Sequence, residues 1–374
     1  MYRFETNAYL RALCLLLTVA LSSLVQAEQG LITAARSDDE NLVAELLAAG
    51  ADPNTRQGDG STALHWAAHR NNGEAVQFLL GSGANPDASN ELGATPLWLA
   101  ASNGSAAVVE KLLTAGANPN ARLRMGETSL MSASRTGDLD TVSLLINAGA
   151  EIDAAEEERG QTALMWAVAQ SHRAVASMLL EHGADLNARS KVWYQLENTA
   201  GNTNPSGNYR MAHGGSSAIM FASRVGDIDT AETLLDAGAN VNDTAASGVS
   251  ALTQAAHSGH EELAIYLLER GADPNAIEAG YTPLHAAVLR SELKLVRALL
   301  EHGAAIDIPV EHGTPGRRFS ADYSIRSQLI GRDAFWMAAK YGEVEIKLYP
   351  EKAPNHVARF KKFSDEGKYD NVVF

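Results

Sequence analysis

Two pairs of closely spaced histidines are the first residues of this chain whose types and spacing could do chemistry. His65 and His69 are separated by about one helical turn, and His257 and His260 by slightly less. On a helix, imidazoles one turn apart share a face and can hold a metal ion. The alternative is that each histidine has a structural or a surface role. No ordered Ser/His/Asp set, phosphate loop or paired-carboxylate motif accompanies them.

A second set of side chains has the chemistry of protein recognition, because Trp, Tyr and Arg dominate binding hot spots. One group follows short apolar runs rich in Ala: His69, Arg70, Ser102, Asn103, Arg135, Arg224, His257 and Arg290. A second group lies in turn-rich segments: Arg122, Arg124, Trp193, Tyr194, Tyr209, Arg210, Arg317, Arg318 and Phe319. We predict that both groups contact a protein or peptide partner. For the aromatic residues the alternative is that they attach their own loop to the rest of the chain.

The elements that must position these residues come from one phrase that recurs along the chain. It begins with a hydroxyl residue, continues through an Ala pair and a Leu pair, and ends in Gly-Ala. The hydroxyl residues recur at a period of about 33 residues. They are Thr62, Thr95, Thr128, Thr162, Ser217, Ser250 and Thr282. Such a period predicts a repeat protein.

Each part of the phrase has a local physical reason. Thr95 can cap a helix, and Pro96 then occupies a first-turn position that needs no N–H. Leu112-Leu113 supplies the apolar stripe of a second helix, and Gly116 suits the left-handed residue that ends it. One helix pair cannot bury its own apolar face. Stacking of several pairs is therefore expected to create one core.

The phrase resembles the ankyrin repeat, most clearly at residues 93–101 and 280–287. This resemblance implies an all-α solenoid of about eight to nine helix pairs, spanning residues 28–341. It also implies a structural role for His65, so that we expect neither a metal ion nor a cofactor. Function is then expected to be protein binding on the concave face. Residues 160–167, 185–190 and 313–318 further resemble a family of exported bacterial ankyrin proteins.

Two insertions interrupt the period, at residues 190–213 and 308–330. Both follow a Gly-Ala phrase, which in ankyrin proteins leads to the tip of a loop. We expect both to project from one edge of the repeat domain. Loops of this length usually have a function or lack fixed structure. We expect the polar middle of the first insertion, residues 198–208, to be disordered.

The N-terminal residues 1–27 read as a secretory signal peptide. Arginines flank an apolar run at residues 12–21, and Val25-Gln26-Ala27 fits small-residue cleavage. The alternative is a membrane anchor, but the run is shorter than the roughly 20 residues that span a bilayer. Cys14, the single cysteine, lies within this run. We expect a periplasmic or secreted protein with no stable membrane span after cleavage.

Composition narrows the class of partner. The formal net charge is −15 at pH 7, whereas nucleic-acid binding requires a basic face. We therefore expect no nucleic-acid partner. Aromatic residues make up only 6% of the chain, which suits a repeat core built from small residues. We expect a monomer.

Residues 342–374 depart from the repeat. Glu343-Val344-Glu345-Ile346-Lys347-Leu348 alternates with period two, which predicts a strand, and Pro350 prevents a helix. From Gly342 the text resembles the opening of a cyclophilin-type peptidyl-prolyl isomerase. In that family a catalytic Arg follows the position of Phe374, so we expect no catalytic residue and no enzymatic activity in these residues. The alternative function is an ankyrin–cyclophilin fusion acting as a periplasmic isomerase, of which this segment is an inactive fragment.

Overall fold

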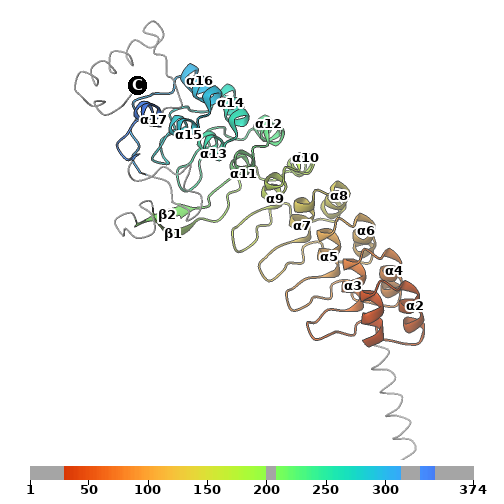
Figure 1. The fold of residues 1–374 in the computed structure, drawn as a ribbon. Coiled ribbons are helices and arrows are strands. Elements are labelled where there is room, and N and C mark those ends of the chain that lie inside the picture. The colour runs from red at the N-terminus through yellow and green to blue at the C-terminus, as the bar shows by residue number, and fades with distance from the viewer. Residues whose placement is uncertain (1–28, 199–207, 313–328, 342–374) are drawn as a thin grey trace, which may run out of the picture. The chain divides into compact units, whose positions relative to one another are not determined.

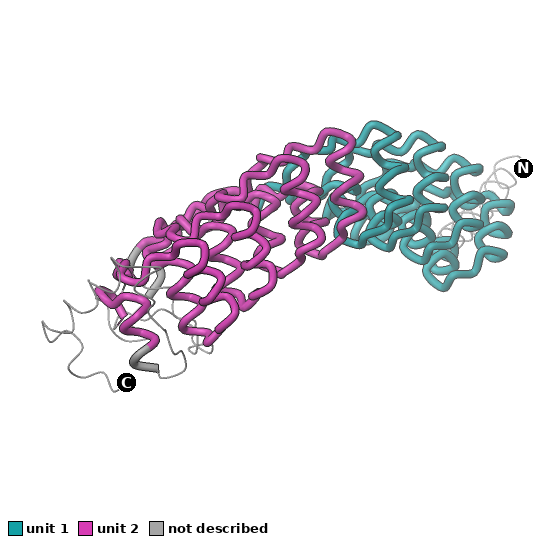
Figure 2. The backbone as a smooth tube through the Cα atoms, turned by 90° about the horizontal axis from the view of Figure 1, so that it is seen from above, with its two compact units in different colours: residues 1–158 teal, residues 159–374 magenta. Residues whose placement is uncertain are grey.

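The computed structural model describes residues 29–198, 208–312 and 329–341. The chain divides into two compact units, Met1–Glu158 and Arg159–Phe374, which are coloured separately in Figure 2. The described part of each unit consists mainly of short helices joined by loops (Figure 1). The prediction of a mostly helical repeat protein is therefore confirmed.

The first unit contains two rows of helices. The inner row lies next to the loops (Figure 1) and comprises α3 (Ala63–His69), α5 (Pro96–Ser102) and α7 (Ser129–Thr136). The outer row comprises α2 (Glu40–Ala48), α4 (Gly73–Gly81), α6 (Ala106–Thr114) and α8 (Leu139–Asn147). Neighbours within a row pack side by side, α3 on α5 and α5 on α7, while each inner helix also packs on the outer helix that follows it.

The second unit repeats this arrangement. Its inner helices are α9 (Ala163–Ala169), α11 (Ala218–Val225), α13 (Ala251–Ser258), α15 (Pro283–Leu289) and α17 (Ala334–Tyr341). Its outer helices are α10 (Arg173–Glu181), α12 (Ile228–Asp236), α14 (Glu261–Glu269) and α16 (Leu293–Glu301). Each inner helix again packs on the next inner helix, from α9 through to α17.

Hydroxyl residues begin the inner helices, as the repeat predicts. The Thr95 side chain accepts a hydrogen bond from the backbone N–H of Trp98 at 3.2 Å, and Thr128 accepts one from Met131 at 3.3 Å. Pro96 occupies the first turn of α5. The outer helices begin at caps that the repeat reading did not include. Among them, Asp138 accepts from the N–H of Thr141 at 2.7 Å.

The core of each unit lies between the two rows. Ala67 and Ala68 of α3 are fully buried, and Ala100 and Ala101 of α5 are too, so neighbouring inner helices approach closely. In most of the outer helices one leucine of the pair is fully buried while the other is only half-buried, as with Leu112 and Leu113. Most outer helices therefore fully bury only one leucine of the pair in the core.

We call the loop that links one helix pair to the next a fingertip. In several fingertips one backbone N–H donates to a carbonyl across the loop, closing it: Gln57 to Ser61, Asn90 to Ala94, Leu123 to Glu127 and Ala245 to Val249. Ser190 donates to Ser216 in the same way, at 3.0 Å. Residues 191–215 are therefore inserted at the end of a fingertip.

The inserted segment forms a two-stranded antiparallel sheet of β1 (Trp193–Asn198) and β2 (Asn208–His213) (Figure 1). Its register pairs Trp193 with His213 and Asn198 with Asn208. The expectation of an all-α chain before residue 342 is corrected here, because residues 193–198 and 208–213 pair as strands. Residues 199–207, the centre of the segment expected to be disordered, lie outside the described residues.

The other inserted segment also starts from a paired base. The backbone N–H of Val310 donates to the carbonyl of Arg332 at 2.9 Å, next to an isolated bridge between Pro309 and Asp333. Residues 313–328 lie outside the described residues, and Arg317, Arg318 and Phe319 are among them. Within the part of the chain that the structure describes, no helix has the length and apolar character needed to cross a bilayer.

Candidate functional site

The structure gives the two histidines of α3 different roles. His65 is buried, and its Nδ1 lies 3.1 Å from the backbone N of Thr62 while its Nε2 lies 3.0 Å from the carbonyl oxygen of Ala94. Both ring nitrogens are therefore already engaged by the protein. His69 is exposed, and its ring meets the ring of Trp66 edge-on at 6.2 Å. No group of three or more metal-ligating side chains occurs among the described residues.

Several of the predicted partner residues on the inner helices bond to the preceding repeat. Arg70 Nε donates to the carbonyl of Arg36 at 3.0 Å, and Asn103 Nδ2 donates to the carbonyl of His69 at 2.7 Å. Arg290 Nη1 likewise donates to the carbonyl of His257 at 3.3 Å. These side chains hold neighbouring repeats together. The sequence predicts only partner contact for these side chains, because it does not show which carbonyl of the neighbouring repeat lies within reach of each one.

Arg135 lies in a charged cluster on the inner side of the first unit. Its Nη2 is 3.9 Å from Glu127 Oε1 and 3.4 Å from the hydroxyl of Ser132. Burial raises the pKa of Glu127, and the charge of Arg135 only partly offsets this effect. Glu127 was not predicted as a site residue. In the preceding fingertips the equivalent residues are Ser61 and Ala94, so an acidic residue here was a signal that the sequence contained.

The second unit carries a comparable cluster around α13 and α15. The His257 ring lies 5.9 Å from the Tyr281 ring, and burial lowers the pKa of His257, with a further contribution from the charge of Arg290. Arg290 Nε bonds Glu292 Oε1 at 2.9 Å, and burial raises the pKa of Glu292. These residues are therefore brought together.

Two further predicted residues, Arg224 and Ser102, occupy other environments. The Arg224 guanidinium lies 5.2 Å from the centre of the Phe221 ring. Ser102 donates its hydroxyl to the carbonyl of Leu99 at 2.8 Å, within its own helix. Ser102 lies in the first unit and Arg224 in the second.

The fingertip arginines of the first unit differ in their environment. Arg122 forms an ion pair with Glu151 at 2.6 Å. Arg124 is exposed, and its backbone N–H donates to the carbonyl of Leu92 at 3.0 Å, so its guanidinium is not used in that bond. Arg124 is therefore the more accessible of the two to a partner.

The β1–β2 hairpin gathers the largest group of predicted partner residues. Trp193 stacks on His213 with ring centres 5.5 Å apart, and the Arg159 guanidinium lies 5.6 Å from the Trp193 ring. Arg210 lies 4.7 Å over the ring of Tyr194. Tyr209 occupies the position in β2 opposite Glu197. The aromatic residues are thus bound into the hairpin and do not pack on the helices alone.

The exposed fraction of these aromatic residues bears on whether they contact a partner or attach their own loop to the rest of the chain. Tyr194 is 59% exposed and Trp193 is 38% exposed. The sequence reading missed Leu196, which is 66% exposed on the same face of β1 as Tyr194. The alternation of Val192, Tyr194 and Leu196 was a strand signal that could have identified it.

Gly214 fixes the point where β2 returns to the fingertip. Its φ is +76°, and a Cβ there would lie 2.0 Å from the carbonyl oxygen of Lys191 and 2.8 Å from the Trp193 ring. Any residue with a side chain would be strained at this φ and would collide with the backbone. Glycine therefore determines how the hairpin leaves the repeat.

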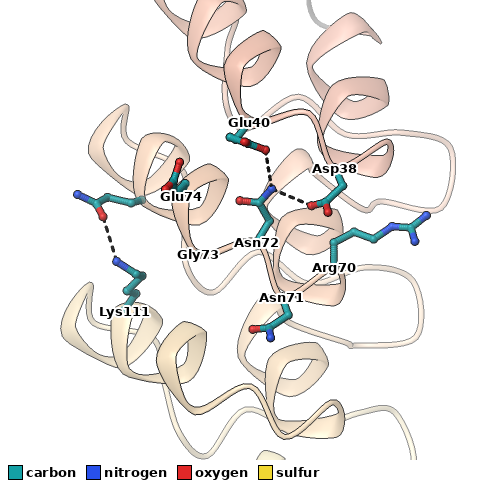
Figure 3. A pocket seen from close by; sticks show the side chains of 9 residues that line it. Asp38, Glu40, Arg70, Asn71, Asn72, Gly73, Glu74 and Lys111 are labelled. Carbon is teal, nitrogen blue, oxygen red and sulfur yellow. Dashed lines mark hydrogen bonds between the residues drawn. The ribbon is translucent and has the colours of Figure 1, made fainter.

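An open depression of about 570 Å³ lies at the turns between inner and outer helices of the first unit (Figure 3). It is lined by Asp38, Glu40, Arg70, Asn71, Asn72, Gly73, Glu74, Gln77 and Lys111. Asn72 Nδ2 donates to Asp38 Oδ1 at 2.7 Å and to Glu40 Oε2 at 3.3 Å, and Lys111 Nζ donates to Gln77 Oε1 at 3.0 Å. Much of its polar lining thus bonds to itself, and of the predicted partner residues only Arg70 belongs to it.

Comparison with known proteins agrees with this geometry. A family model for ankyrin repeats in three copies matches residues 31–123, 108–190, 200–278 and 219–312. A second family model, cyclophilin type peptidyl-prolyl cis-trans isomerase, matches residues 335–374. That match begins inside α17 and runs into residues 342–374, which lie outside the described residues.

Three curated relatives share the repeats. An ankyrin repeat domain-containing protein of Stachybotrys chartarum is 33% identical over 40% of this chain and 7% of its own length. An ankyrin repeat-containing protein of Treponema pallidum is 38% identical over 24% of this chain and 31% of its own. An E3 ubiquitin-protein ligase of Arabidopsis thaliana is 29% identical over 40% of this chain and 31% of its own. The matches thus span a minor part of each relative, and the ankyrin model covers well over half of this chain. This chain belongs to the ankyrin-repeat family.

Proposed function

We propose that this chain is a protein-interaction scaffold that binds a protein or peptide partner through its inner helices and fingertips. The observation that carries the proposal is a contrast between repeats. Core positions repeat the same residue types, as in Ala67-Ala68 and Ala100-Ala101, and these are fully buried. The inner-helix ends that follow them carry different polar side chains, from His69 in one repeat to Arg135 in another. Positions that differ in this way suit recognition.

Not every predicted residue supports the proposal equally. All four of Arg70, Asn103, Arg124 and Arg224 are exposed. Arg70 and Asn103 each donate to a carbonyl of the preceding repeat, whereas Arg224 lies over Phe221 of its own helix. We therefore assign partner contact first to Arg124, Arg224 and the hairpin aromatics. Ion pairs on the surface contribute little to stability, so charge reversal at exposed positions should leave the fold intact.

The test is capture of a partner by the immobilised full chain, followed by charge reversal. Arg124→Glu and Arg224→Glu should each reduce capture, because they change the charge presented to a partner. Lys294→Glu is the matched control, since Lys294 is an exposed cation on an outer helix, with its side chain 79% exposed. An equal loss of partner capture in all three variants would refute binding through the inner helices and fingertips.

The match of residues 335–374 to the cyclophilin model favours a second candidate function. In that case the ankyrin repeats would recruit substrates for prolyl isomerisation. We propose that this chain itself does not catalyse that reaction, because the residues that resemble a cyclophilin contain no catalytic Arg. A proline isomerisation assay on the full chain tests this, and a rate above the uncatalysed one would refute it.

We also propose that the protein is exported. The proposal rests on the apolar run at residues 12–21 and the small-residue triplet that ends at Ala27. N-terminal sequencing of the protein from the envelope or medium of an expressing cell should find Glu28 first. Material that begins at Met1 would favour a membrane anchor instead.

A further inference from the structure

One face of β1 is largely apolar and exposed to solvent. Val192, which precedes the strand, is 45% exposed, Tyr194 is 59% exposed and Leu196 is 66% exposed. Alternate residues of a strand share a face, so the three form one apolar strip. A strand that faced a core would bury such a strip. An isolated two-stranded hairpin is marginally stable in water, and a third strand would add to its stability.

The hairpin is held in place at its base on both sides. The backbone N–H of Lys191 donates to the carbonyl of Arg159 at 2.6 Å, in the preceding fingertip. The N–H of Ala246, in the following fingertip, donates to the carbonyl of Gly214 at 2.9 Å. β1 therefore leaves the repeat on the side of Arg159, and β2 on the side of Ala246.

The edge of β1 away from β2 is open to backbone pairing. The sheet order is β1–β2, so among the described residues each strand has a ladder partner on one side only. Such an edge offers N–H and C=O groups to another extended chain. Because β1 leaves the repeat beside Arg159, its open edge lies on the side of that residue.

Two arginines lie over the aromatic rings of β1, although the chain as a whole carries a charge of −15 and Glu197 belongs to the strand. Arg210 stands opposite Leu196 in the register and diagonal to Tyr194, and its guanidinium lies 4.7 Å over the Tyr194 ring. Ala212, opposite Tyr194, is small enough to leave that ring open to Arg210. On the other face of β1, Arg159 lies over Trp193. Both faces thus combine an aromatic ring with a cation.

We infer that β1 binds an extended segment of a partner protein in which acidic and apolar residues alternate, added to the sheet as a third strand. The apolar residues of that segment would cover Val192, Tyr194 and Leu196. Its carboxylates would then point to the opposite face, toward Arg159. Main-chain pairing supplies affinity in this mode of recognition, and alternate side chains supply specificity. The inference rests on the proposed scaffold function and names its partner class.

The probe is an acetylated, amidated peptide that alternates Glu with Val, labelled with fluorescein and titrated with the full chain. Fluorescence anisotropy should show about tenfold tighter binding than for the matched peptide with Gln in place of Glu. Two further peptides carry methyl groups on alternate backbone nitrogens, one at the even and one at the odd positions. One of them should bind about tenfold more weakly, because only one edge of the peptide pairs with β1. Raising the salt from about 0.05 to about 0.5 M should weaken binding several-fold.

Variants locate the binding on β1. Tyr194→Ser combined with Leu196→Ser should reduce affinity about tenfold, since both lose their apolar contact with the peptide. Arg159→Glu should remove the preference for Glu over Gln. The matched control is Met125→Ser, an apolar residue 54% exposed at a fingertip of the first unit, which should bind like the unaltered chain. Unchanged circular dichroism shows that each variant is folded.

Three outcomes would overturn the inference. The first is equal binding of the Glu and Gln peptides, or equal binding by the Tyr194/Leu196 double variant. The second is concentration-dependent self-association in sedimentation that the double variant loses, which would make the strip a contact between copies. The third is co-sedimentation with phosphatidylglycerol vesicles that the double variant loses, which would make it a lipid contact.

The experiment separates this inference from the scaffold function. If Arg124→Glu and Arg224→Glu abolish partner capture while the hairpin variants do not, the scaffold function stands and the strand-addition inference fails. If the hairpin variants lose the peptide while the inner-side variants leave capture unchanged, the inner-side assignment fails instead.

Discussion

His65 joins its own helix to the next repeat through Ala94. The His65 Nδ1 accepts the backbone N–H of Thr62 at 3.1 Å, so the proton of the neutral ring lies on Nε2. Nε2 then donates to the Ala94 carbonyl at 3.0 Å. The ring is buried, and burial lowers the pKa of His65, which keeps this tautomer neutral. A residue that could have been a metal ligand therefore acts as a cross-repeat bond.

Replacing this histidine should be costly. His65→Ala leaves the Thr62 N–H and the Ala94 carbonyl without their partner in a buried setting, which costs about 1–3 kcal/mol of unfolding free energy. His69→Ala is the control, because His69 is exposed, and should cost less than about 0.5 kcal/mol. Urea unfolding followed by circular dichroism measures both. Equal effects would show that the cross-repeat bond adds no stability.

Stability should fall with acid because of a second buried histidine, His285. Burial lowers the pKa of His285 to about 4, from an ordinary value of 6.5. Above pH 6.5 neither the folded nor the unfolded state binds a proton at His285, so the stability contributed by the neutral, buried ring is fully present. As the pH falls from 6.5 toward 4, only the unfolded state gains the proton, so stability is lost, by about 3 kcal/mol over this window.

The measurement compares pH profiles of unfolding free energy. The profile of His285→Gln should be flatter between pH 6.5 and 4 than that of the unaltered chain. Partly buried carboxylates such as Glu127 contribute in the opposite direction, but they are identical in both proteins and cancel in the difference. Parallel profiles for the two proteins would contradict the assignment.

Two left-handed glycines of the second unit should respond differently to alanine. A Cβ at Gly248 would lie 2.2 Å from the carbonyl oxygen of Glu278 in the next fingertip, whereas a Cβ at Gly238 would meet nothing within 4 Å. Both have a positive φ, so each alanine costs about 1–2 kcal/mol of backbone strain. Gly248→Ala adds the collision and should cost about 1–3 kcal/mol more. Similar midpoints in urea would mean that the fingertips can move apart freely.

Core leucines of the outer helices should be sensitive to truncation. Leu145 is fully buried in α8, so Leu145→Ala should cost about 2–5 kcal/mol through lost burial and the cavity left behind. Leu92→Ala removes a leucine that is 67% exposed at a fingertip and should cost less than about 0.5 kcal/mol. Damage to one repeat should loosen its neighbours first. Hydrogen exchange of the amides in α6 and α8 would detect this.

Features that depend on short stretches of sequence could be predicted, and features that depend on stacking could not. Thr95 and Pro96 predict the start of α5 correctly, because helix capping depends only on residues that are close in sequence. The bond from Arg70 to the Arg36 carbonyl needs the distance between two stacked repeats, which no local pattern contains. The strands at 193–198 and 208–213 were missed because pairing depends on register across an Asn- and Gly-rich segment. The alternation of Val192, Tyr194 and Leu196 indicates β1 but does not identify residues 208–213 as its partner strand.

The hairpin should be removable without loss of the helices. Ser190 and Ser216 are joined by the same backbone bond as Gln57 and Ser61, so the tip Gly58-Asp59-Gly60 can replace residues 191–215.

In the unaltered fingertips a tip N–H donates to the preceding tip, as Glu91 does to Asp59 at 2.9 Å, and the graft should restore that bond to Arg159. We expect unchanged helical circular dichroism and a loss of unfolding free energy below about 1 kcal/mol. Partner capture should fall at the same time, because Trp193, Tyr194 and Leu196 are gone. A grafted chain that loses its helical signal would show instead that Trp193 and Tyr194 support the repeats, and that their exposure does not reflect binding.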